Sequence, residues 1–153
     1  MQKDPRYPIG KFDLNITVTK EMRSDFIKTI ETIPSQLKKE VENLSEQQLN
    51  TPYRDGGWTV RQVIHHLPDS HINSYVRFKL ALTEDNPQIK TYEEHLWAEL
   101  PDSFNTQIDV SLNLLESLHN RWAILLRSLT DEQFEIGKLW PIGIEALLGR
   151  NRF

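Results

Sequence analysis

The sequence has 153 residues, 38% of them hydrophobic and 26% charged, with a formal net charge of −4 and no cysteine, which is typical of one soluble globular domain. The lack of basic blocks argues against a nucleic-acid partner, and the lack of a secretory signal or of an apolar run of roughly 18 residues predicts a cytoplasmic protein with no membrane partner. Without cysteine there is no thiolate nucleophile or disulfide, and a metal would have to be held by His, Asp or Glu.

The chain reads as one domain, residues 1–153, which opens with an extended arm over residues 1–18, where prolines and a glycine separate isolated apolar residues. Thr19 is the expected N-cap of a long helix, because apolar residues recur from there at spacings of three and four as far as Leu44. Pro34 lies inside this helix. Proline removes a backbone donor, so we expect a bend at this position.

A short capped helical turn over residues 45–49 and a glycine-containing loop over residues 51–57 should follow. Thr59 is the expected N-cap of a second long helix that reaches Leu82, again with apolar residues at spacings of three and four. Pro68 interrupts this helix beside its histidines and should kink it.

Residues 83–108 form a long crossover in which the sequence favours one short helix, over residues 92–100. A third long helix is predicted from Asp109 to Thr130, and a second capped turn follows it over residues 130–134. The remainder of the chain leaves room for at most one short helix, over residues 144–148. Three long helices without a strand pattern predict an all-α bundle, although a four-helix bundle needs one more long helix.

Three of the five histidines, His65, His66 and His71, lie close together on the second helix. Their spacings of 1, 5 and 6 differ from the three or four residues that place two ligands on one helical face. At about 100° per residue, His71 falls on the apolar stripe and should be buried, whereas His65 and His66 flank the stripe. For His71, and for His119 on the third helix, the alternative to a functional role is a hydrogen-bonded core histidine.

Other polar and aromatic residues are interpreted structurally. His95 in the crossover has no partner pattern and is expected at the surface. Asp55 and Asp69 could orient an imidazole or cap a helix, and we favour the structural role for both. Trp58 and Trp122 are expected to fill the core rather than to contact a ligand. From these residues alone, a metal site remains one alternative among several.

The segment from residue 51 to residue 80 resembles the DinB-like superfamily and, within it, the YfiT-like branch. It reads TPYRDGGWTVRQVIHHLPDSHINSYVRFKL. Supporting matches are YPIG at residues 7–10, YEEHLWAEL at residues 92–100 and LHNRWAILLRSLTDEQF at residues 118–134. The resemblance covers about residues 7–141, and its central block is far longer than a motif that recurs by chance.

The resemblance implies a four-helix bundle that holds one divalent metal, zinc or nickel, with three histidines. One ligand is the histidine of a pattern in which Trp-Thr is followed by six residues and His-Leu, and it falls on His66. The family supplies the other two as a His-x-x-x-His pair on its fourth long helix, but no histidine follows His119 in this sequence, and residues 142–153 do not match that helix. We therefore expect a fourth helix that is truncated or altered beyond Pro141. Pro68 is a second departure, because the family usually has alanine there.

For members with the full ligand set, the resemblance implies a metal-dependent hydrolase or a transferase that adds a low-molecular-weight thiol, such as bacillithiol, to a small electrophilic substrate. A metal with an open position suits both reactions, because it lowers the pKa of a bound water or thiol. In this scheme His66 holds the metal, and His71 is a candidate acid–base or metal-supporting group. The resemblance also implies a homodimer.

Three hypotheses follow for this chain. In the first, it is such an enzyme and completes its ligand set with His71, His119 or a neighbouring subunit. In the second, it is a catalytically inactive family member that lacks two of the three metal ligands. In the third, it is a helical interaction module whose apolar stripes, exposed without a fourth long helix, bind a partner helix.

Overall fold

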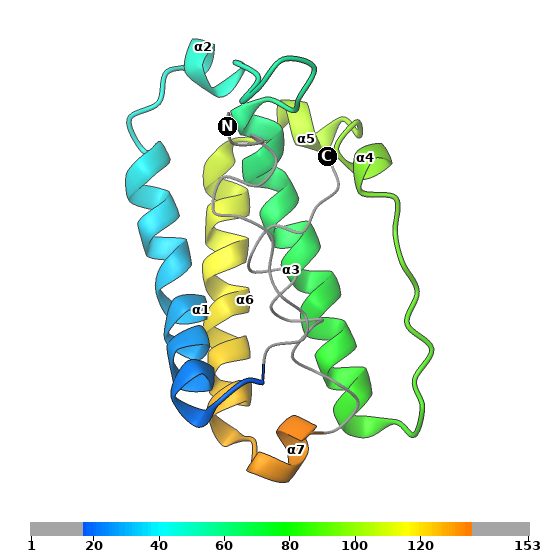
Figure 1. Ribbon diagram of the computed structural model, residues 1–153. Coiled ribbons are helices and arrows are strands. Elements are labelled where there is room, and N and C mark those ends of the chain that lie inside the picture. The colour runs from blue at the N-terminus through cyan, green and yellow to red at the C-terminus, as the bar shows by residue number, and fades with distance from the viewer. Residues whose placement is uncertain (1–16, 136–153) are drawn as a thin grey trace, which may run out of the picture.

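The computed structural model describes residues 17–135, and three long helices dominate this part of the chain. They are α1 (Lys20–Val41), α3 (Val60–Thr83) and α6 (Ile108–Ser128). Four short helices accompany them: α2 (Glu46–Leu49), α4 (Glu94–Trp97), α5 (Asp102–Asn105) and α7 (Asp131–Glu135). Helix α6 is central, because α1 and α3 both pack against it (Figure 1). Residues 17–135 contain no strand, so the prediction of an all-α fold is confirmed.

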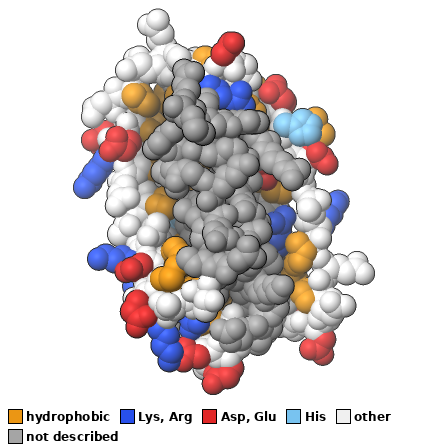
Figure 2. Space-filling model, in the orientation of Figure 1, with side chains coloured by type: hydrophobic (Ala, Val, Ile, Leu, Met, Phe, Trp, Pro, Cys, Tyr) orange, Lys and Arg blue, Asp and Glu red, His pale blue; other side chains and the backbone are white. Residues whose placement is uncertain are grey.

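Two of the sequence predictions fall largely or wholly outside the described residues. Of the expected arm over residues 1–18, the structure describes only the last two residues, and the non-matching tail over residues 142–153 lies beyond residue 135. The described helices include none that is long and apolar enough to cross a membrane. On the face shown in Figure 2, acidic and basic side chains are interspersed.

Side-chain caps fix where four of the helices begin. Thr19, Ser45, Thr59 and Thr130 each accept a hydrogen bond from the backbone N–H three residues further on. After the last three caps, a glutamine side chain also accepts from the N–H of the cap residue and completes a capping box. The predicted starts of these helices are confirmed.

The first helix is shorter than its apolar spacing predicted. It ends at Val41, and Leu44 lies in the turn that follows, where its N–H donates to the Val41 carbonyl at 3.1 Å. Leu44 continues the spacing because it still packs on the core cluster that contains Val41 and Leu49. In the crossover, the helix expected over residues 92–100 is confined to α4, and α5 forms after it.

Both internal prolines lie within continuous helices. Helix α1 runs through Pro34 and helix α3 runs through Pro68, so neither proline ends its helix, and the expected bends stay predictions. A proline lacks the N–H that would bond to the carbonyl four residues earlier. Pro34 therefore releases the carbonyl of Ile30 from the hydrogen-bond ladder of α1, and Pro68 does the same for Ile64 in α3.

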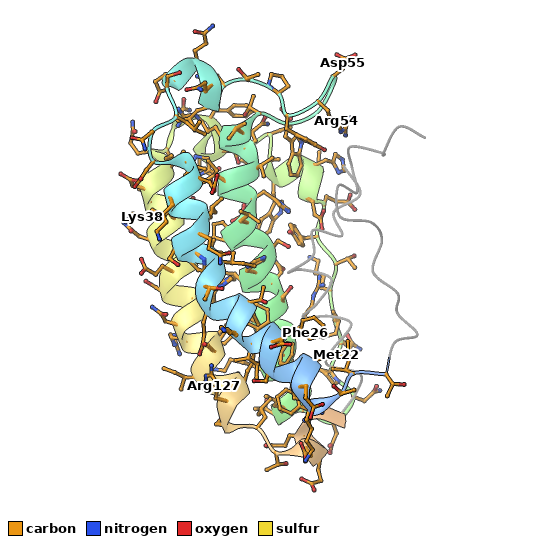
Figure 3. All side chains as sticks on the ribbon, turned by 60° about the vertical axis from the view of Figure 1, so that its left-hand side comes forward. Met22, Phe26, Lys38, Arg54, Asp55 and Arg127 are labelled. Carbon is orange, nitrogen blue, oxygen red and sulfur yellow. The ribbon has the colours of Figure 1, made fainter. Side chains whose placement is uncertain are left out.

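The core has two apolar clusters joined along α6. The larger contains Ile27, Ile30, Phe78, Trp122, Ala123, Leu126 and Phe134, and the smaller contains Val41, Leu49, Ile64 and Leu112. At the surface, Arg127 of α6 donates two hydrogen bonds, of 2.7 and 2.6 Å, to the carboxylate of Glu31 on α1 (Figure 3). Such a two-point contact fixes the orientation of the two helices as well as their distance.

Candidate functional site

His66, the predicted metal ligand, is buried on α3 with 3% of its surface exposed. Its ring lies 5.0 Å from the ring of Trp58, centroid to centroid, at a tilt of 56°. The helical wheel placed His66 beside the buried stripe, but α4 and α5 also pack on α3 and give the helix a wider buried surface. Trp58 is only half-buried, so the prediction that it fills the core is wrong, whereas Trp122 is fully buried as predicted.

His65 is buried as well and holds α3 to the start of α6. Its Nδ1 lies 2.7 Å from Oγ of Ser111, and its Nε2 lies 3.2 Å from the carbonyl oxygen of Thr106. A carbonyl can only accept, so Nε2 carries the proton and Nδ1 accepts from the serine hydroxyl. Burial lowers the pKa of His65, although its bond to the Thr106 carbonyl opposes the effect. Both ring nitrogens therefore serve a structural role in a neutral imidazole.

His71 and His119 are the two candidate histidines that the structure brings together. They are 1% and 0% exposed, and Nδ1 of His71 lies 2.6 Å from Nε2 of His119. Nδ1 of His119 lies 2.6 Å from the carbonyl oxygen of Ile30, the group that Pro34 releases. The contacts link α3, α6 and α1 in turn, and we call them the histidine relay. Both residues are buried and hydrogen-bonded, as expected for core histidines.

The histidine relay lies in apolar surroundings. The ring of Trp122 stands nearly perpendicular to both imidazoles, with centroids 6.4 Å from His71 and 6.3 Å from His119. The indole N–H of Trp122 is itself buried without a hydrogen-bond acceptor. Burial lowers the pKa of His119, although its bond to the Ile30 carbonyl opposes the effect. These surroundings favour neutral imidazoles, because charged groups are poorly solvated there.

A set of ionisable groups gathers where the crossover meets α3. Burial first, and then the charge of Asp102, raise the pKa of Asp69 to about 6. Burial raises the pKa of Tyr92 to about 12, and Ser70 offsets only part of this effect. The Tyr92 hydroxyl is buried without a hydrogen bond of ordinary geometry. Sequence reasoning missed Tyr92, because its burial depends on how the crossover folds and not on a local pattern.

The two other groups considered from the sequence lie at the surface. Asp55 is exposed at the tip of the loop before α3, next to Arg54 and away from the helices (Figure 3). It therefore orients no imidazole, and Thr59 caps the helix instead. The side chain of His95 is 69% exposed and lies 3.6 Å from the Glu93 carboxylate, as expected for a surface histidine.

The described residues do not form a complete metal centre. Within residues 17–135, no group of three or more His, Asp or Glu side chains could hold a metal ion. His65 and His119 use both ring nitrogens in hydrogen bonds, so either would have to break one to bind a metal. Five residues apart, His66 and His71 project about 140° from each other on an ideal helix. This part of the chain therefore does not form a three-ligand site by itself.

Residues 29–147 match the family model of the DinB superfamily. The chain belongs to the DinB superfamily. It is 53% identical over 135 residues to “Putative metal-dependent hydrolase YfiT” of Bacillus subtilis (strain 168), an alignment that covers 88% of this chain and 76% of that protein. A Bacillus cereus (strain AH820) relative, also with “putative metal-dependent hydrolase” in its name, is 58% identical over 132 residues, which cover 86% of this chain and 76% of the relative.

The fold of this DinB superfamily member is also that of a solved structure. YfiT from Bacillus subtilis matches with a TM-score of 0.89 and 45% identity, over 95% of this chain and 90% of that chain, and it is described as a four-helix bundle of unusual topology. The family and the bundle fold expected from the sequence are thus confirmed.

Proposed function

We propose that this chain is a metal-dependent enzyme of the hydrolase class, in which His66 is one protein ligand of a divalent cation, zinc or nickel. The observation that carries the proposal is a buried imidazole at the family's ligand position, in a chain 53–58% identical to proteins named as metal-dependent hydrolases. A divalent metal with an open position would supply an activated water, or an activated low-molecular-weight thiol in the transferase variant of the reaction.

The described residues do not bring together the remaining ligands. All five histidines lie within residues 17–135, so histidine from the rest of this sequence cannot complete the site. Candidate sources include His71 or His119 after a rearrangement of their hydrogen bonds, carboxylates elsewhere in the sequence, a second copy of the chain in a homodimer, and the thiol cosubstrate itself. Nδ1 of His71 is already engaged by His119, which makes His71 a poorer metal ligand. We therefore assign His71 an acid–base role.

A second candidate function is a family member without catalysis. The observation that favours it is the commitment of His65 and His119 to hydrogen bonds, together with the absence of a complete donor set in residues 17–135. Such a chain would keep the bundle fold and bind no metal. Its function would then be to bind a partner helix through exposed apolar residues of α6, namely Val110, Leu114 and Ile124.

Metal content separates the two candidates. After dialysis against a mild chelator, we expect elemental mass spectrometry to find about one zinc or nickel per chain in the unmodified protein. His66→Ala should lose this metal, and the matched control His95→Ala, at an exposed imidazole, should keep it. Metal far below stoichiometry in all three proteins would overturn the enzyme proposal, and metal retained by His66→Ala would overturn the role of His66.

A further inference from the structure

We propose that His119, with the Ile30 carbonyl that Pro34 releases, fixes the tautomer of His71, so that His71 carries its proton on Nδ1 and keeps Nε2 as the basic atom. His119 is then a positioning residue that acts through His71. The tautomer itself follows from the histidine relay alone, and only the use of Nε2 as the base rests on the proposed function.

The argument begins at the Ile30 carbonyl, because an oxygen of this kind can only accept a hydrogen bond. In an uninterrupted helix it would accept from the N–H four residues later, but that residue is Pro34, which has none. Nδ1 of His119 occupies the released acceptor at 2.6 Å. The proton between these two atoms therefore belongs to His119 Nδ1.

The second step concerns Nε2 of His119. The residue is fully buried against Trp122 and Ile30, and no carboxylate takes part in the hydrogen bonds of its two ring nitrogens. A second proton would place an uncompensated charge in this apolar cluster, so the imidazole is neutral. A neutral imidazole has one N–H, already assigned to Nδ1, and Nε2 must therefore accept.

The third step assigns His71. Its Nδ1 faces Nε2 of His119 at 2.6 Å. If His71 carried its proton on Nε2 instead, two lone pairs would face each other across this short distance. The contact is attractive only with the proton on His71 Nδ1, and the bond at one ring nitrogen then determines what the other can do. In neutral His71, Nε2 is left as the acceptor and base.

The arrangement is more specific than core packing requires. Apolar side chains would fill the same volume without aligned donors and acceptors, and a proline inside a helix normally destabilises it. Here the proline stands four residues after the one carbonyl that His119 uses. Three helices thus contribute one member each to a directed series of hydrogen bonds, in which His71 donates to His119 and His119 donates to the Ile30 carbonyl.

Imidazole ¹⁵N NMR of the full chain without metal tests the inference. In long-range ¹H–¹⁵N spectra recorded above neutral pH, His71 should show a protonated Nδ1 and an unprotonated Nε2, assigned by the loss of its signals in His71→Asn. His119→Phe keeps a ring but removes the acceptor, so His71 should move toward the Nε2-protonated tautomer. His119→Gln restores an acceptor at the position of Nε2 and should restore the Nδ1-protonated tautomer.

Further measurements keep the inference testable if His119→Phe fails to fold. Pro34→Ala returns a backbone N–H that competes for the Ile30 carbonyl, and it should shift the His119 Hδ1 resonance upfield, as a weaker bond does. His65→Gln, at the other buried hydrogen-bonded histidine, should leave the His71 signals unchanged. An Nε2-protonated His71 in the unmodified protein, or an unchanged tautomer in folded His119→Phe, would overturn the inference. Because no metal or activity is involved, a failed metal assay would affect only the proposed function.

Discussion

The carboxyl group of Asp69 is partly buried where the crossover packs on α3, and its pKa is raised to about 6 by burial and then by Asp102. The folded protein thus holds this proton more tightly than the unfolded chain, where the group titrates near 3.8. Linkage then gives the direction of the effect. The Asp69 carboxyl does not affect stability at a pH where it is protonated in both states. It lowers the free energy of unfolding progressively as pH rises from about 4 to about 6, and by a constant amount above that.

Asp69→Asn should therefore stabilise the protein at neutral pH. We expect an increase of about 1 kcal/mol in the free energy of unfolding near pH 7.5, after allowance for solvent screening of a partly exposed group. The gain should shrink as pH falls and nearly disappear near pH 3, below the unfolded pKa of 3.8, where the carboxyl is largely protonated in both states. Urea unfolding at the two pH values measures it, with Asp55→Asn at the exposed loop tip as the control. A gain of equal size at both pH values would contradict the assignment.

At the level of single residues, the sequence predicted burial better than it predicted partners. His71 and His119 lie on apolar stripes, and their burial follows from that position alone. Their contact with each other depends on how α3 and α6 rotate about their axes, which a single stripe does not define. Pro34 in the sequence already indicates that the Ile30 carbonyl, four residues earlier, lacks its helical donor. The partner of that carbonyl on α6 is 89 positions away, and no local pattern predicts it.

At the level of elements, two similar capping boxes have different surroundings. In α2, the side chain of Gln48 accepts a hydrogen bond from the N–H of its cap Ser45, in an exposed turn. In α3, Gln62 forms the same box with Thr59 and is 5% exposed. Its Nε2 also donates to the carbonyl of Ala98 at 2.9 Å. One side chain therefore caps the helix and fastens the crossover to it.

Gln62→Ala should consequently be more damaging than Gln48→Ala. Loss of a cap interaction costs about 1 kcal/mol, which is the upper range expected for the exposed box. Removal of Gln62 also leaves the buried Ala98 carbonyl without its donor, which should lower the free energy of unfolding by about 1–3 kcal/mol more. Chemical unfolding of the two variants measures the difference. Similar losses would mean that the bond to Ala98 contributes nothing to stability.

Element starts were predictable because capping is a local interaction between residues three positions apart. Ser45, Thr59 and Thr130 illustrate this, since each cap and its glutamine are visible in the sequence. The crossover was harder to predict. Helix α5 has no side-chain cap, and it packs against α3, so its formation depends on tertiary contacts. The burial of His66 and Tyr92 depends on that same packing.

At the level of the whole molecule, acid should act on the helix contacts through two buried histidines. Burial lowers the pKa of both His65 and His119, so the unfolded chain binds their protons more readily than the folded protein. Their contribution to stability is complete above the unfolded pKa, near 6.5, and is lost as pH falls through the lower folded values. Asp69 acts in the opposite direction over part of this range, so Asp69→Asn is the suitable background.

In that background, the thermal midpoint should fall as pH is lowered from about 7.5 to 5, by about 3 °C for each kcal/mol lost in a domain of this size. His65→Gln and His119→Gln should each flatten the dependence, because neither variant can take up the proton that favours unfolding. His95→Gln should leave it unchanged, since that side chain is exposed. A midpoint that stays constant over this range, or a slope that neither buried-histidine variant reduces, would show that the two imidazoles do not couple acid to unfolding. Loss of the slope in His119→Gln alone would assign the coupling to the contact that joins α3, α6 and α1, rather than to the bonds of His65 with the crossover and α6.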